Sequence, residues 1–151
     1  MAKKIEVRNQ SEFDDCVKDG NIAVVINCSV IARDNNSVIA RDNSSVIAND
    51  NSFIMAYDNS SVEARGKSSV MAYDNSSIIA SDNSSVMAYD NSSVMARNNV
   101  FIRIFSCSKT KANSSVVILK HSNKGKIEGG RQLDLIKETK QQATTEDKAN
   151  V

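Results

Sequence analysis

The sequence contains no tryptophan and no proline, and its 151 residues include only five glycines, three cysteines and one histidine. The low glycine content excludes a collagen-like chain, and three cysteines are too few for a disulfide-stapled miniprotein. Nineteen basic and 18 acidic residues give a net charge of +1, which excludes a strongly charged disordered chain. One histidine and 5% aromatic residues leave little material for a catalytic site, so we expect neither an enzyme nor a cofactor.

The three cysteines, Cys16, Cys28 and Cys107, are widely spaced. This spacing predicts reduced thiols that act as small buried apolar groups, and it lacks the close pairs or histidine partners of a zinc site. We therefore expect no metal ion. No segment approaches the ~20 apolar residues that a membrane helix needs, and no apolar signal segment follows the basic N-terminus. These absences predict a cytoplasmic protein without membrane contact.

An eight-residue repeat runs from Val30 to Asn99. Its first position is Val or Ile and its third is Ala in all nine copies. Asp fills the fifth position except at Gly66 and Asn98, and Asn fills the sixth except at Lys67. Such a short and fixed period is typical of a solenoid, in which each unit packs only on its neighbours.

Each unit is predicted to be a short strand followed by a turn. Apolar residues alternate with period two, so that Ser60, Val62 and Ala64 point to one side, and β-branched residues are frequent. The Asp-Asn pair supplies the turn, because Asn tolerates the left-handed conformation and Asp can hydrogen-bond to its own backbone. A turn of this kind explains a solenoid with little glycine.

A period of sixteen residues is superimposed on the shorter one. Tyr57, Tyr73 and Tyr89 recur at this interval and Phe105 continues the row. The alternate units carry other residues at the same place: Arg33, Asn49, Arg65, Ser81 and Arg97. One coil therefore contains two units, and the sequence predicts an all-β parallel β-solenoid (β-helix) of about six coils over residues 22–121. We call the sheet of tyrosine-bearing units the tyrosine sheet and the other the arginine sheet.

Residues 1–21 are expected to form an N-terminal strand and a short helical cap. Ser11 is a candidate N-cap residue, and Phe13 and Cys16 share one face of the helix. A cap of this kind would cover the open end of the solenoid, where unpaired strand edges promote aggregation. We expect Ile22 and Val24 to enter the solenoid with their side chains inward, in the register of the repeat.

Residues 122–151 are expected to lie outside the solenoid. Gly125, Gly129 and Gly130 predict a flexible linker, Gln132 to Lys140 a short helix, and the polar remainder a mobile tail.

The second repeat position points outward, yet it is Ile or Met in eight of nine copies, and Glu63 is the exception. Met and aromatic residues, which are enriched in interface cores, gather on the tyrosine sheet. We expect this sheet to bind a partner, most simply a second copy packed sheet on sheet. An alternative is that caps or neighbouring side chains merely cover some of these residues. The expected partner-binding residues are Ile39, Phe53, Met55, Tyr57, Met71, Tyr73, Met87, Tyr89, Phe101 and Phe105.

Positive charge gathers after the repeat, where residues 100–131 carry a net charge of +6. The basic patch consists of Lys109, Lys111, Lys120, Lys124, Lys126 and Arg131. It could meet phosphate or an acidic partner, or it could be an ordinary solvated surface. Nucleic-acid binding through this patch is the less favoured alternative, and we do not expect a nucleic acid as partner.

The unit Ser68-Ser-Val-Met-Ala-Tyr-Asp-Asn75 resembles the octapeptide-repeat proteins encoded by phages and prophages, which carry similar arrays after an N-terminal segment. It is also similar to the sixteen-residue tyrosine-bearing coil of bacterial ice-nucleation proteins. The resemblance covers about 70 residues of repeat and about 20 of cap. It implies a phage or mobile-element origin, with a host or virion protein as partner and a role in virion structure or in blocking a host defence complex.

The leading hypothesis is therefore a non-enzymatic interaction module that binds itself and a further protein. Ice binding is the first alternative, since flat solenoids suit it. However, all four threonines, at positions 110, 139, 144 and 145, lie outside the regular array. The single histidine, His121, has no evident nucleophile near it in the sequence, so a Ser-His-Asp arrangement is not indicated.

Overall fold

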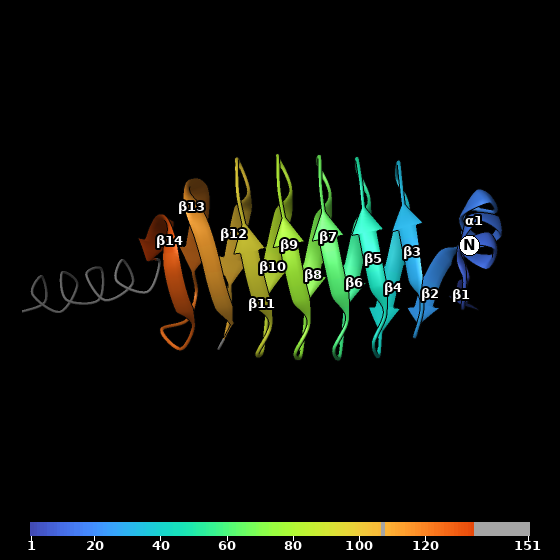
Figure 1. Cartoon of the computed structure of the whole chain (residues 1–151), viewed down its shortest axis with the longest axis horizontal. Helices are drawn as coiled ribbons and strands as arrows, with labels where there is room; N and C mark the ends of the chain where they lie inside the picture. The colour runs from blue at the N-terminus through green and yellow to red at the C-terminus, as the bar shows by residue number, and fades with distance from the viewer. Residues whose placement is uncertain (107, 135–151) are drawn as a thin grey trace, which may run out of the picture.

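The computed structural model describes residues 1–106 and 108–134. The chain forms an all-β parallel solenoid of about eight turns, with coils of about sixteen residues and one short helix, α1 (Gln10–Lys18), at its N-terminal end (Figure 1). The predicted fold is confirmed. The solenoid is longer than the six coils expected over residues 22–121, because a strand of the cap and a strand after residue 121 continue the stack.

Two sheets run along the rod, and every strand pairing in them is parallel. The tyrosine sheet contains, in spatial order, β1 (Lys4–Val7), β2 (Ile22–Ile26), β4 (Ser37–Arg41), β6 (Phe53–Ala56), β8 (Ser69–Ala72), β10 (Ser85–Ala88) and β12 (Phe101–Ile104). The arginine sheet contains β3 (Ser29–Ala32), β5 (Ser45–Ala48), β7 (Ser61–Ala64), β9 (Ser77–Ala80) and β11 (Ser93–Ala96). The long strand β13 (Lys109–Lys120) pairs with β11 and then with β12, and β14 (Lys126–Asp134) pairs with β13.

In this register, each residue pairs with the residue that holds the same repeat position sixteen residues further along the chain. Val70 pairs with Val86 and Met71 with Met87, for example. Backbone hydrogen bonds continue between coils around the corners, where the Tyr57 N–H donates to the Ala40 carbonyl at 2.9 Å. Identical environments thus recur along the rod, which is why the sequence can repeat.

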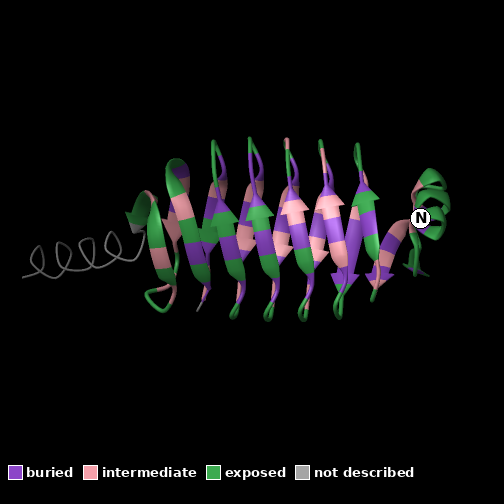
Figure 2. Ribbon diagram, viewed as in Figure 1, coloured by how far each residue is buried: buried purple, intermediate pink, exposed green. Residues whose placement is uncertain are grey.

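The core is a narrow layer between the two sheets, filled by the first and third positions of each unit. Val62 is 1% exposed and Ala64 0%, and Ser60 at the corner is also 0% exposed, so the predicted inward set is confirmed. Figure 2 shows the resulting alternation of buried and more exposed residues along each strand. Alanine holds the third position throughout the regular array, and the larger Val25 and Ile104 take the same inward row at its two ends.

Each corner turns on one residue with a left-handed backbone, and this residue is the Asp of the repeat. Asp42, Asp58 and Asp74 have φ between 55° and 58°, and Gly66 holds the equivalent place with φ of 66°. We had expected the following Asn to take this conformation. We had also expected the Asp carboxylate to bond to its own backbone. Instead, the Asp58 Oδ2 accepts from the N–H of Asp42, one coil away, at 3.2 Å.

The first coil is one residue shorter than the others, and this shift corrects an expectation. Val24 pairs with Ile39, an offset of fifteen residues, whereas Ile39 pairs with Met55 at sixteen. A slip of one residue moves a strand's side chains to the opposite face. Consequently Ala23 and Val25 are fully buried, and Ile22 and Val24, which we expected inside, point outward.

Helix α1 closes the N-terminal end beside β1. Its N-cap is Asn9, not Ser11: the Asn9 Oδ1 accepts from the Glu12 N–H at 3.0 Å, and the Glu12 carboxylate returns to the Arg8 N–H at 2.8 Å. Phe13 and Cys16 are buried against the first coil, as expected. Cys28 is half-buried, and Cys107 lies outside the described residues.

The prediction of a flexible linker from residue 122 onward is wrong for residues 126–134, because they form β14 and extend the solenoid. Gly129 and Gly130 lie inside this strand with φ of 76° and 71°, opposite an irregularity between Ala112 and Val117 of β13. A Cβ at Gly129 would collide with the Ala112 carbonyl oxygen, so this glycine permits a close approach and does not mark a flexible break. We had expected a helix to begin at Gln132, but residues 132–134 belong to β14. The rest of the predicted helix and the predicted tail lie outside the described residues.

Across the described part of the chain, no helix is both long and apolar enough to cross a membrane.

Candidate functional site

A continuous stack of rings follows one edge of the tyrosine sheet. The centroids of Tyr57 and Tyr73 are 4.9 Å apart, those of Tyr73 and Tyr89 4.8 Å, and those of Tyr89 and Phe105 4.7 Å, with interplanar angles of 6–7°. These distances repeat the spacing between neighbouring strands. The predicted vertical row of aromatic rings is therefore confirmed.

Two residues that the sequence analysis left out complete this stack. The His121 ring lies 4.5 Å from that of Phe105, and the Arg41 guanidinium lies 5.6 Å from the Tyr57 centroid at the other end. The sixteen-residue period could have identified both residues, because His121 lies sixteen residues after Phe105 and Arg41 lies sixteen residues before Tyr57. The stack thus begins on a guanidinium, whose positive charge favours contact with a π face, and ends on an aromatic imidazole ring.

The methionines of the tyrosine sheet are covered in part by its tyrosines. The Tyr73 hydroxyl lies 3.6 Å from the Met71 sulfur, and the pairs Tyr57–Met55 and Tyr89–Met87 repeat this contact at 3.8 and 3.9 Å. Each ring therefore leans across its own strand, and the side chains of both rows are half-buried. The alternative reading of the sequence, coverage by neighbouring side chains, holds in part for these residues.

Burial raises the pKa of the Tyr73 hydroxyl, and the neighbouring Tyr57, Tyr89 and Asp90 raise it further. The phenol in the middle of the stack is therefore kept in its neutral form, as a contact with an apolar surface requires.

The outward rows of the tyrosine sheet are free of charge from β6 to β10. Phe53 begins one flanking row, in which Ser69, Ser85 and Phe101 follow in register. Ile39 differs from our expectation of an exposed residue: it is only 3% exposed, since it lies between Val24 and Met55 in the adjacent strands. The other nine expected partner-binding residues lie on this face and are half-buried.

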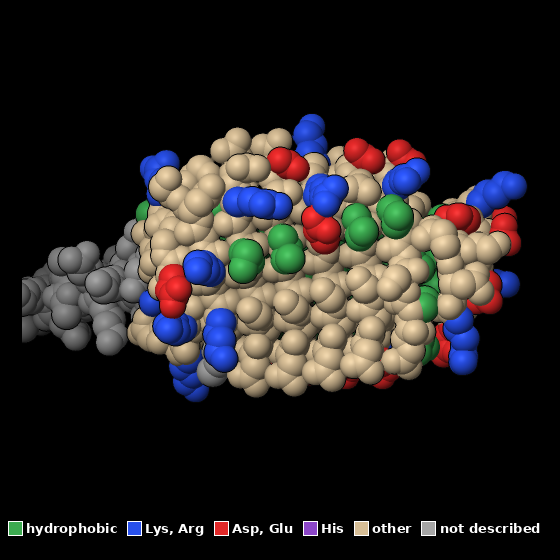
Figure 3. All heavy atoms as spheres, in the orientation of Figure 1, with side chains coloured by type: hydrophobic (Ala, Val, Ile, Leu, Met, Phe, Trp, Pro, Cys, Tyr) green, Lys and Arg blue, Asp and Glu red, His purple; other side chains and the backbone are tan. Residues whose placement is uncertain are grey.

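The arginine sheet has a different outer surface on the same backbone. Its large apolar side chains are more exposed, at 38% for Ile31, 42% for Ile79 and 55% for Met95. Figure 3 shows hydrophobic side chains in a line along the rod, interrupted by an acidic residue and bordered by basic ones. The acidic residue of this row is Glu63, which the Arg65 guanidinium binds through Nε at 3.0 Å and Nη2 at 2.5 Å.

The structure divides the expected basic patch between the two sheets. Lys109 and Lys126 are neighbours on the arginine sheet, where Lys111 pairs with Glu128. The Lys126 ammonium also contacts the Glu128 carboxylate at 3.1 Å. The remaining members lie elsewhere, on the tyrosine sheet or in the turn before β14: Lys120, Lys124 and Arg131.

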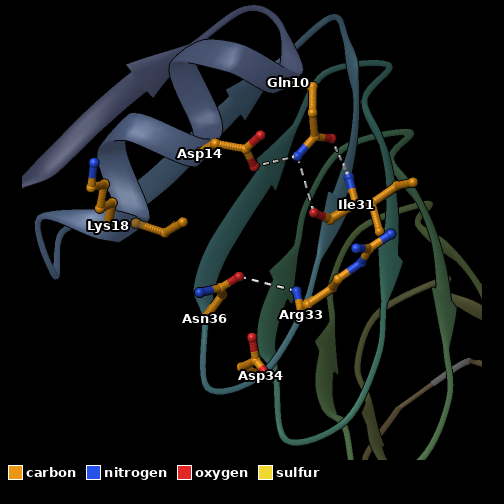
Figure 4. A pocket seen from close by; sticks show the side chains of 8 residues that line it. Gln10, Asp14, Lys18, Ile31, Arg33, Asp34 and Asn36 are labelled. Atoms are coloured by element: carbon orange, nitrogen blue, oxygen red, sulfur yellow. Dashed lines mark hydrogen bonds between the residues drawn. The ribbon is translucent and has the colours of Figure 1, made fainter.

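Two hollows mark the ends of the arginine sheet. The larger, of about 420 Å³, lies between α1 and β3 (Figure 4). In it the Gln10 side chain accepts from the Ile31 N–H at 2.7 Å and donates to the Ile31 carbonyl at 3.2 Å, replacing a neighbouring strand at this edge. The smaller, of about 250 Å³, is lined by Met95, Lys109, Lys111 and other residues of the last coils.

The corners of the two sheets differ in how their buried serines are satisfied. After the arginine sheet, the Ser84 Oγ donates to the Ser81 carbonyl at 2.8 Å, and Ser52 and Ser68 make the same contact. After the strands that lead into Tyr57, Tyr73, Tyr89 and Phe105, the serines Ser60, Ser76, Ser92 and Ser108 have a buried Oγ without a hydrogen-bond partner among the described residues. Ser44, which follows Arg41 on the same sheet, is an exception, because its Oγ donates to the Arg41 and Val25 carbonyls.

Comparisons with known proteins add no family to this description. No protein-family model matches the chain. No curated protein and no solved structure matches it either. The functional argument therefore rests on the two outer faces of the solenoid.

Proposed function

We propose that this chain is a non-enzymatic protein-interaction module that associates with a second copy of itself through the tyrosine sheet. The observation that carries the proposal is the surface from β6 to β10, where no outward side chain is charged and Met, Phe and Tyr occupy most positions. Such a composition matches the core of a protein interface, from which charged residues are depleted.

The whole outer face of the tyrosine sheet is just large enough for a dimer. Its uncharged centre, from β6 to β10, lies between Arg41 on β4 and Arg103 on β12. The seven strands from β2 to β13 span about 29 Å, and three outward residues with their side chains span about 20 Å. A flat contact of this size buries roughly 1,200 Å² in total, near the lower limit for a stable specific interface. We therefore expect a dimer that dissociates at low concentration.

Light scattering after size exclusion tests the proposal, with the wild type measured over a range of concentrations. The wild type should be dimeric at high concentration, and the variant Met55→Glu/Met71→Glu/Met87→Glu should be monomeric. The matched control, Ile31→Glu/Ile79→Glu/Met95→Glu, places the same charges on the arginine sheet and should remain dimeric. Circular dichroism verifies that each variant is folded. A wild type that is monomeric at every concentration would end the proposal, whatever the variants do.

The resemblance to phage octapeptide-repeat proteins supports a setting for this module. In that setting it is a virion component or an inhibitor of a host defence complex, and a pull-down from the natural host would identify the partner.

Ice binding is the second candidate, because rows of like side chains, such as Tyr57, Tyr73 and Tyr89, recur at a regular spacing along the rod. Thermal hysteresis of the purified protein distinguishes it from the proposal above.

A further inference from the structure

The arginine sheet carries two features that the proposed dimer does not use. The first is a row of apolar side chains with Ile31, Ile79 and Met95 exposed. The second is an excess of positive charge, because its outward positions carry six basic and two acidic residues. The basic residues are Arg33, Arg65, Arg97, Lys109, Lys111 and Lys126.

Both acidic residues of this face are already bound within it. Arg65 binds Glu63 at 2.5 Å, and Lys126 binds Glu128 at 3.1 Å. Within residues 1–106 and 108–134, neither Lys109 nor Lys111 has a carboxylate within 4.0 Å. The last two coils of the face are therefore a concentrated positive surface beside the exposed Met95.

We propose that the arginine sheet is a second docking surface, and that its occupant is an acidic amphipathic helix of another protein. The whole face spans about 29 Å from β3 to β14, the length of a helix of about 20 residues. Its apolar row covers the first ~19 Å, from β3 to β11, and Lys111 and Glu128 hold the same position on β13 and β14. Apolar residues spaced three and four apart on such a helix recur about every 5 Å, close to the spacing of the row. Its carboxylates meet the lysines of β13 and β14.

Charge also sets the direction in which this helix lies. The hollow at the α1 end is lined by two acidic and two basic residues, which balance each other: Asp14, Asp34, Lys18 and Arg33. The hollow at the other end is lined by three lysines and one glutamate and is therefore positively charged. The most acidic end of the helix therefore lies over β13. A nucleic acid would neutralise the same lysines but would leave the apolar row from Ile31 to Met95 in water, which is why a peptide fits this face better.

Fluorescence anisotropy with the full chain and a labelled synthetic peptide tests the proposal. The peptide has about 20 residues, with leucines on one helical face and glutamates concentrated toward one end. We expect the variant Lys109→Glu/Lys111→Glu to weaken binding at least ~10-fold, and Ile79→Ser/Met95→Ser to weaken it ~5-fold. The matched control, Met71→Ser/Met87→Ser on the tyrosine sheet, should bind normally at concentrations at which the chain is monomeric. Circular dichroism is measured for all variants.

Three results would overturn this proposal. One is equal affinity for a peptide of the same composition in which the leucines do not share a face. Another is an unchanged affinity of the Lys109→Glu/Lys111→Glu variant. The last is a single-stranded oligonucleotide of similar length that binds more tightly than the peptide. None of them bears on the dimer, whose test measures the oligomeric state in the absence of any peptide.

Discussion

The two sheets of this solenoid have the same backbone and the same inward residues, yet their outer surfaces differ. In the regular array, the inward positions are Val or Ile and Ala on both sheets, and these side chains are buried. The outward positions carry stacked rings and methionines on one sheet and serine, isoleucine and arginine on the other. The difference shows that the eight-residue period encodes the fold, whereas the sixteen-residue period encodes what each face can bind.

The sheets should also differ in their contribution to stability. Four ring-to-ring contacts run along the tyrosine sheet, and the corresponding position on the arginine sheet holds exposed Arg33, Arg65 and Arg97. Stacked rings stabilise beyond the area they bury, whereas exposed charged side chains contribute little.

Removing the central ring should give the largest contrast between the sheets. Tyr73→Ala loses contacts with Tyr57 and Tyr89 and should lower the free energy of unfolding by about 2–3 kcal/mol. Arg97→Ala, at the same repeat position on the arginine sheet, should change it by less than about 0.5 kcal/mol. Urea unfolding followed by circular dichroism measures both. Equal losses would show that the stack adds nothing to stability.

The buried serines of the two kinds of corner give a smaller contrast. Ser84→Ala removes a hydroxyl that donates to the Ser81 carbonyl and should cost about 1 kcal/mol. Ser76→Ala removes a buried hydroxyl without a partner among the described residues and should be neutral or stabilise by about 0.5–1 kcal/mol. The same unfolding experiment tests the pair, and a clear loss of stability for Ser76→Ala would contradict the contrast.

The smallest effect is a dependence on alkaline pH that only the tyrosine sheet should show. The pKa of Tyr73 is raised in the folded state, so the unfolded chain loses this proton first as the pH rises past about 10. The stability that the raised Tyr73 pKa contributes to the folded state is fully present below that pH, and it is lost as the pH rises through the pKa of the folded state. Tyr73→Phe should lose less stability than the wild type between about pH 9 and 11 in urea unfolding. Parallel curves for the two proteins would contradict the raised pKa.

The regular part of the fold could be predicted because period and chemistry agree in every unit. Alternation predicted the strands, and the recurrence of Tyr57, Tyr73 and Tyr89 predicted the length of the coil. Prediction failed where the repeat ends, since the fifteen-residue first coil and the glycine-containing β14 follow no period. In the turns, both Asp and Asn are compatible with a left-handed backbone, so sequence alone did not decide between them.

The sequence predicted which residues make up the candidate site better than it predicted how far their side chains are exposed to solvent. The repeat indicated which residues share the tyrosine sheet, but the lean of each ring over its methionine depends on side-chain rotamers that no pattern specifies. The exposure of Ile79 and Met95 is evident only in the structure, because a tyrosine covers each methionine of the other sheet, whereas Ser81 and exposed Arg97 hold that position beside Ile79 and Met95.

The offset of sixteen residues between paired strands also defines the unit in which this protein can change its length. A deletion or duplication of sixteen codons would put tyrosine on tyrosine and leave the remaining array intact. A deletion or duplication of eight codons would keep the core residues inward. Beyond the break, however, the residues of the tyrosine sheet and those of the arginine sheet would exchange places. Recombination between repeats can therefore lengthen or shorten both faces together, in steps of one coil.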